Sequence, residues 1–186
     1  MGRECIVSSR YYLASQLPSF SVHASSSLPV TEDYFIDLCS RCLDGRSVNI
    51  LRSLSLEPPK ECAKTGSALV DSWYEWERGL RFALAQVRAA KLKKEFSVNT
   101  QNLSADIVQI ARTASGMSSP LEAEEFLNNE RFAALESLRP IDEFSTDAFF
   151  YYALKLKLAL RIRKFNTEAG MHAYRAIYDR ILGEAT

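Results

Sequence analysis

The clearest pattern in the chain is a long stretch in which apolar residues recur at helical spacing. Across residues 67–94 they step by alternating four and three positions, at Leu69, Trp73, Trp76, Leu80, Ala83 and Val87. This spacing places them on one side of an α-helix that packs along its length against another helix. A helix of about 28 residues is roughly 42 Å long, so the pattern predicts an elongated body.

Charged residues in the same stretch follow the direction of the predicted helix. The acidic residues lie in its first half and most of the basic residues in its second half, an order that complements the helix dipole. Glu77 and Arg81 are four positions apart, so we expect them to form an ion pair along one face of the helix.

A second long element is predicted at residues 145–164, where two periodicities compete. From Leu154 to Arg163 apolar and basic residues alternate, which is typical of a half-buried strand. The length of the stretch, its many Ala, Leu, Lys and Arg residues, and a Ser145 cap followed by Asp147 favour a helix. We therefore expect a largely buried helix whose Lys and Arg head groups reach the surface.

Shorter amphipathic segments with cap signals complete the pattern. Helices are expected at residues 31–43 (closed by Gly45), 47–54, 104–113, 121–138 (opened by Pro120, with Phe126, Leu127, Phe132 and Leu135 inward) and 167–182. The last helix carries one apolar stripe, formed by Met171, Tyr174, Ile177, Tyr178 and Ile181. Residues 11–18 fit either a strand or a single helical turn ended by Pro18, and residues 19–29 fit a loop.

Together these elements predict an all-α fold. We expect an elongated helical bundle with two long helices, at about residues 67–94 and 145–164, and several shorter ones. We divide the chain into an N-terminal segment and loop, residues 1–30, and a single helical domain, residues 31–186.

The charge balance narrows the classes of partner. In 186 residues, 23 Lys and Arg balance 23 Asp and Glu, which argues against a dedicated nucleic-acid binder. The chain lacks an apolar run near the roughly 20 residues that cross a bilayer, and its first residues lack the apolar core of a signal peptide. We expect a cytoplasmic protein with no membrane span and no nucleic-acid partner.

Cys39 and Cys42 form the only pair at metal-ligand spacing. A structural zinc site needs four ligands, and the other candidates are scattered at Cys5, Cys62, His23 and His172. Two small thiols on the inward face of a helix are therefore the favoured interpretation. A metal-binding regulator remains the weaker alternative.

Other residues that resemble catalytic or binding groups have structural explanations. The seven glycines are too dispersed for a phosphate-binding loop. We expect helix-dipole, surface or core roles for the following residues: Glu122, Glu124 and Glu125 (dipole), His23 (surface), His172 with Glu168 (surface pair), and Trp73, Tyr74 and Trp76 (core). The basic residues between Lys155 and Lys164 form either a solvated helix end or a surface for an acidic partner, lipid headgroups or nucleic acid, and of these an acidic protein partner is the favoured one. The sequence thus predicts no catalytic residue, cofactor-binding residue, metal ligand, cofactor or small-molecule substrate.

Three segments carry a resemblance to a known family. They are Tyr11-Tyr12-Leu13-Ala14-Ser15-Gln16-Leu17-Pro18, Tyr74-Glu75-Trp76-Glu77-Arg78-Gly79-Leu80-Arg81 and Phe149-Phe150-Tyr151-Tyr152-Ala153-Leu154-Lys155-Leu156. With them the chain resembles a family of small bacterial proteins encoded among the subunits of V-type ATPases. Each segment is a packing pattern, and none is a catalytic signature.

The resemblance implies a non-catalytic ATPase subunit, similar to the helical one that couples the central stalk to the membrane ring. The implied partners are other V-type ATPase subunits of the central stalk and the membrane ring. The protein would then lie in the cytoplasm, peripheral to the inner membrane through the complex. The alternative of another class is a free-standing helical adaptor for protein interactions.

Overall fold

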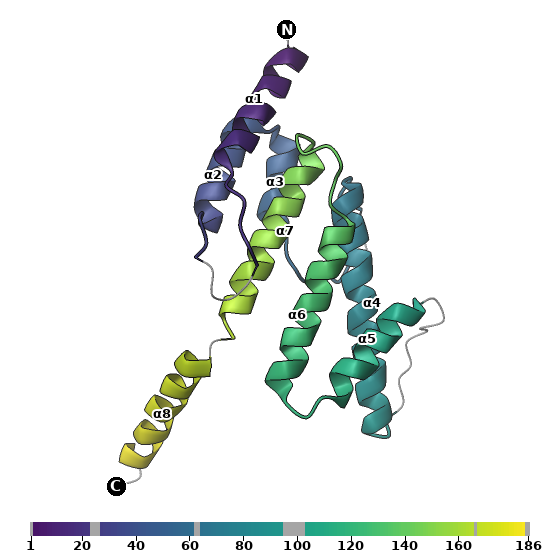
Figure 1. Ribbon diagram of the computed structural model, residues 1–186, viewed down its shortest axis with the longest axis vertical. Helices are drawn as coiled ribbons and strands as arrows, with labels where there is room; N and C mark the ends of the chain where they lie inside the picture. Colours follow the sequence, from purple (N-terminus) through teal and green to yellow (C-terminus); the bar gives the residue numbers. More distant parts are fainter. Residues whose placement is uncertain (1, 23–26, 62–63, 95–102, 166, 185–186) are drawn as a thin grey trace.

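The computed structural model describes residues 2–22, 27–61, 64–94, 103–165 and 167–184. Within these ranges the chain forms eight α-helices and no strand, so the predicted all-α class is confirmed (Figure 1). The helices are α1 Gly2–Gln16, α2 Glu32–Cys42, α3 Gly45–Ser53, α4 Ala68–Lys91, α5 Ala105–Gly116, α6 Pro120–Ser137, α7 Thr146–Arg163 and α8 Thr167–Glu184.

Hydroxyl caps set the starts of four helices. The side-chain oxygens of Thr31, Ser67, Ser119 and Ser145 each accept the backbone N–H three residues further on, which satisfies a donor that the first turn leaves unpaired. Pro120 occupies the first turn of α6, where its missing N–H costs nothing. The predicted starts of α2, α4, α6 and α7 are thus confirmed. Ser104 occupies the corresponding position before α5 without a side-chain cap bond, and α5 continues to Gly116, beyond the predicted end at Thr113.

Gly45 does not close α2, as the sequence suggested. The C-cap of α2 is Leu43, and Gly45 is the first residue of α3. Asp44 caps α3, since its carboxylate accepts the Ser47 N–H at 3.1 Å and the Ser47 hydroxyl at 2.7 Å. The hydrogen bond from the Ser47 hydroxyl, with backbone N–H groups, lowers the pKa of Asp44. The prediction was wrong because a glycine shortly after a helix fits the usual C-terminal signal of that helix, whereas here the glycine begins the next helix.

Residues 11–16 belong to α1 and form neither a strand nor a single turn. Leu13 is fully buried in the main core, and α1 packs against α2. The sequence pattern missed this helix because the residues before Tyr11 show no amphipathic spacing. The segment that we separated as residues 1–30 therefore contributes side chains to the same core as the helices that follow it.

α4 connects two clusters of buried side chains. Its first half, with Leu69 and Trp73, packs in the main core together with α1, α2, α3 and α7. Its second half, with Leu80 and Ala83, packs against α5 and α6. The predicted apolar side of this helix is confirmed, although α4 has 24 residues and ends at Lys91. The Asn-rich break expected near residues 99–102 lies outside the described residues.

α7 lies between the two halves of the body and contacts α2, α3, α4 and α6 (Figure 1). Its helical state is confirmed against the strand alternative, with Phe149, Phe150 and Leu154 almost fully buried. α7 has 18 residues, as do α6 and α8, so α4 alone stands out in length. On α6, Leu127 and Leu135 are buried and Phe126 and Phe132 are half-buried, on the face that was predicted.

Candidate functional site

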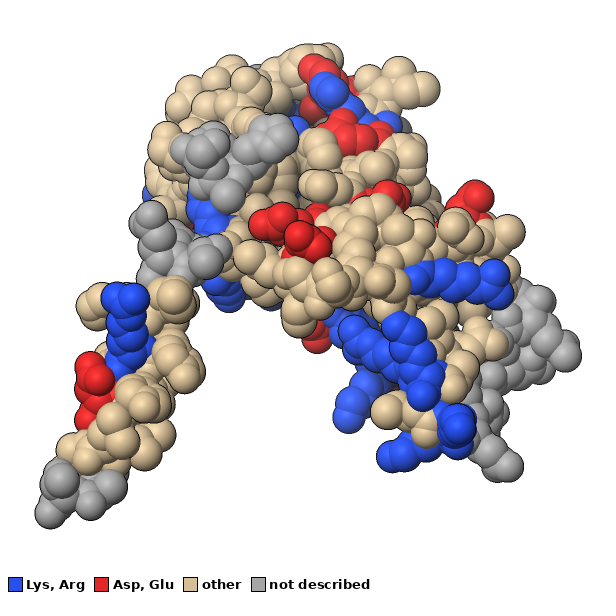
Figure 2. Space-filling view, turned by 60° about the horizontal axis from the view of Figure 1, so that its bottom comes forward, with Lys and Arg blue, Asp and Glu red and all other residues tan. Residues whose placement is uncertain are grey.

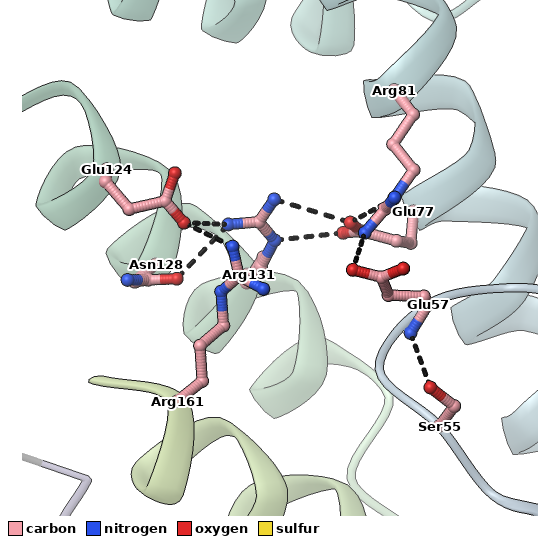
Figure 3. A network of polar contacts seen from close by, with 8 residues as sticks. All are labelled: Ser55, Glu57, Glu77, Arg81, Glu124, Asn128, Arg131 and Arg161. Carbon is pink, nitrogen blue, oxygen red and sulfur yellow. Dashed lines mark hydrogen bonds and ion pairs between the residues drawn. The ribbon is translucent and has the colours of Figure 1, made fainter. Parts of the chain in front are cut away.

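A network of charged side chains lies between α4, α6 and α7 (Figure 3). Its centre is Glu77, whose side chain is only 2% exposed, and Arg131, whose side chain is 6% exposed. Arg131 donates from Nε to Glu77 Oε2 at 3.1 Å and from Nη2 to Glu77 Oε1 at 3.4 Å. Such a paired arrangement gives each buried charge a fixed partner.

Further pairs extend the network in both directions. Arg81 donates to Glu77 Oε1 at 2.9 Å, which confirms the predicted pair, and reaches Glu57 Oε1 at 3.0 Å. On the other side, Glu124 Oε1 accepts from Arg131 Nη1 at 3.3 Å and from Arg161 Nη2 at 2.6 Å. Glu124 therefore does more than serve the dipole of α6. It links α6 to the C-terminal end of α7.

The ion pairs of this network connect α4, α6 and α7. Glu57, Glu77 and Glu124 each accept a guanidinium hydrogen bond or ion pair. The hydrogen bond from Arg81 lowers the pKa of Glu57, so this carboxylate stays charged. A carboxylate held in this way makes a poor proton acceptor for a substrate. The geometry of these described residues joins three helices.

The basic residues of α7 are used largely inside the chain. Lys157 pairs with Glu32 of α2, Arg161 pairs with Glu124, and the Lys155 Nζ lies 3.6 Å from Glu136 Oε1. The solvated helix end is therefore wrong for these three residues, whose side chains are 19–29% exposed, whereas the surface for an acidic partner stays a prediction. Exposed Lys and Arg gather instead around the C-terminal end of α4, at Arg88, Lys91, Lys93 and Lys94 (Figure 2).

Cys39 lies on the inward face of α2, as predicted, and is fully buried. Burial, with a smaller contribution from Cys42, raises the pKa of the Cys39 thiol to about 12. Among the described residues no group of three or more His, Cys, Asp and Glu side chains is placed to hold a metal ion. His172 is exposed on α8. Cys62, His23 and the side chains of Cys5 and Glu168 lie outside what the structure describes.

We expect the protein to lose stability in alkaline solution, beginning with Cys39. Burial also raises the pKa of Tyr151, and that of Tyr152 to about 12. Groups with a raised folded pKa contribute stability that is complete below the unfolded pKa, about 8.5 for Cys and about 10 for Tyr. That contribution is lost as the pH rises through the folded pKa. The urea midpoint should therefore fall from about pH 9 upward.

The matched variant for this measurement is Cys39→Ala. Because it removes the thiol but neither phenol, its urea midpoint should fall less than that of the wild type between about pH 8.5 and pH 10. Equal falls in the two proteins over this range would contradict the role given to Cys39.

The aromatic residues of α4 are packing residues. Trp73 is fully buried and stacks on Trp76, with ring centroids 5.7 Å apart. Tyr74 is buried, and its hydroxyl accepts the Ser55 N–H at 3.2 Å. Core packing is confirmed for Trp73 and Tyr74, whereas Trp76 is half-buried beside a surface cavity.

An uncovered apolar surface lies on α8. Every residue from 170 to 183 is exposed, and no other described helix packs against α8 (Figure 1). The α8 stripe, as we call it, consists of side chains that are each more than half exposed, namely Met171, Tyr174, Ile177, Tyr178, Ile181 and Leu182. The predicted stripe thus exists but faces solvent. A contiguous apolar surface of this kind typically marks a site of protein interaction.

Comparison with known proteins leaves the site to be judged on its own geometry. No family model, no curated protein and no solved structure matches the chain. None of the described helices combines the length and apolar character needed to cross a bilayer.

Proposed function

We propose that this chain is a non-catalytic helical subunit that docks on a larger protein assembly through α8. The observation that carries the proposal is the α8 stripe. Its six large apolar side chains stay exposed while the rest of the chain buries an extensive core. Amphipathic helices bind protein partners by laying such a face into an apolar groove.

The assembly that we propose is a bacterial V-type ATPase. Support comes from the sequence resemblance at residues 11–18, 74–81 and 149–156, together with balanced charge and a helical fold. The protein would be similar to the helical ATPase component that couples the central stalk to the membrane ring. In this proposal α4 and α7 form the axis of an elongated body, which is peripheral to the inner membrane through the complex.

The test is recovery of the tagged full chain from its own cells in mild detergent, with mass spectrometry of the chains that co-purify. We expect the catalytic and central-stalk subunits of the ATPase in fixed ratio. A variant with Tyr174→Ser and Ile177→Ser should lose these chains almost completely, because it interrupts the α8 stripe. The variant should remain folded, since α8 packs against no other described helix.

The matched control is Arg180→Ser, on the side of α8 away from the stripe. It should recover the same chains as the wild type. Recovery of unrelated partners in place of ATPase subunits would contradict the ATPase proposal and favour the free-standing adaptor. Equal recovery by the wild type and by the Tyr174 and Ile177 variant would show that α8 is not the docking element.

A further inference from the structure

A cavity of about 490 Å³ lies at the other end of α7 from α8. Its walls come from the end of α1, the segment after it, the connection between α6 and α7, and the N-terminal half of α7. Two of the segments that carry the family resemblance, residues 11–18 and 149–156, meet here. The volume lies within the range of roughly 300–1,000 Å³ that is usual for small-molecule sites.

Aromatic rings form most of the apolar wall. Tyr11 and Phe144 lie against each other with ring centroids 4.3 Å apart, and Phe20 meets the edge of Tyr152 at 5.2 Å. The Tyr152 hydroxyl donates to the Pro18 carbonyl at 3.0 Å, which ties the segment after α1 to α7. The rings therefore hold one another in place and present a formed surface to a flat or branched apolar ligand.

The cavity carries one positive charge that its own lining does not balance. Its charged lining residues are Arg139, Glu143 and Lys155, and Arg139 already donates to Glu143 at 2.8 Å. Lys155 is the remaining charged residue of the lining, and its ion-pair neighbour Glu136 lies outside that lining.

The Lys155 ammonium is held in position with donor capacity to spare. Its Nζ lies 5.5 Å from the ring centroid of Phe20, 5.6 Å from that of Phe132 and 5.8 Å from that of Tyr151. The carboxylate oxygen of Glu136 at 3.6 Å is beyond hydrogen-bond length and accepts the Tyr151 hydroxyl. An ammonium has three N–H donors, so Lys155 can turn one or more of them to an anion in the cavity.

We propose that this cavity binds a small organic monoanion with an aromatic or branched apolar body. The carboxylate of such a ligand pairs with Lys155, and its body lies between the rings of Tyr11, Phe20 and Phe144. The site is separate from the α8 stripe and does not depend on the docking function.

Naphthoate and its neutral analogue naphthamide are suitable probes, titrated calorimetrically against the full chain. The wild type should bind naphthoate more tightly than naphthamide. Lys155→Met removes the charge and keeps the length of the side chain, so it should weaken naphthoate binding about tenfold or more and change naphthamide binding by less than about threefold. Lys155→Arg should retain the preference for the anion.

Lys157→Met is the matched control, because Lys157 lies on the same helix, is 19% exposed against 20% for Lys155, and also pairs with one glutamate. It should bind naphthoate like the wild type. The proposal is overturned if the wild type binds neither probe or if Lys155→Met binds naphthoate as tightly as the wild type. It is also overturned if Lys157→Met weakens naphthoate binding as much as Lys155→Met does. Loss of binding in the Tyr174 and Ile177 variant would also overturn it, by placing the probe on α8. Circular dichroism shows whether each variant is folded.

Discussion

Arg131→Met should lower the free energy of unfolding by about 3–5 kcal/mol, because it leaves buried charge without its partner. Arg131 makes two hydrogen bonds to Glu77 and further ones to Glu124 and Asn128. After the substitution, the described part of the chain leaves Glu77 one ion-pair partner, Arg81, whose side chain is 40% exposed. Urea unfolding followed by far-ultraviolet circular dichroism measures the loss.

An exposed ion pair provides the comparison for this prediction. Arg139 donates to Glu143 at 2.8 Å, with side chains 55% and 67% exposed, so Arg139→Met should cost about 0.5 kcal/mol or less. Combining Arg131→Met with Glu77→Leu should restore part of the lost stability, because the charge left buried is also removed. Losses of similar size for Arg131→Met and Arg139→Met would show that the network contributes little.

Trp73→Ala should lower the free energy of unfolding about as much as Arg131→Met does, by about 3–5 kcal/mol. Trp73 is fully buried where α4 meets the main core, and removing its indole leaves a cavity that the surrounding helices cannot close. The free energy of unfolding in urea and the shift of tryptophan emission measure the effect together.

Trp76→Ala is the natural control, since Trp76 stacks on Trp73 but is half-buried. Trp76→Ala should lower the free energy of unfolding clearly less than Trp73→Ala, because less apolar area returns to water. Trp73→Phe should also cost less than Trp73→Ala, because a ring still fills most of the site. If Trp73→Ala and Trp76→Ala were equally destabilising, the division between core and surface on α4 would be wrong.

Local signals in the sequence were sufficient for most helices. An apolar side with steps of three and four residues located α4, and length, helix-forming residues and the Ser145 cap located α7; all of these signals act within one element. Gly45 shows the limit of such signals. The same glycine fits the end of one helix or the start of the next, and only the carboxylate of Asp44 on Ser47 decides between them.

The sequence predicted the Glu77–Arg81 pair but not the rest of the charge network, and the reason differs from that for Gly45. Glu77 and Arg81 are four residues apart, whereas Arg131 lies far along the chain on another helix. A weak signal was present, because Glu77 falls between Trp73 and Leu80 on the apolar side of α4, and Arg131 falls between Leu127 and Leu135 on that of α6. Charged residues at such positions indicate buried partners, but the sequence alone does not say which ones. The exposure of the α8 stripe depends likewise on what the other helices leave uncovered.

The isolation of α8 has a thermodynamic consequence. A helix of 18 residues without tertiary packing is only marginally stable in water. In the proposed docking, the partner that covers the α8 stripe supplies much of the order of α8, so that folding of this segment and binding become one event. Part of the interaction free energy is spent on that ordering, which lowers affinity for a given contact area. A protein held through such a segment can be released and replaced more readily than one held through a rigid interface of equal size.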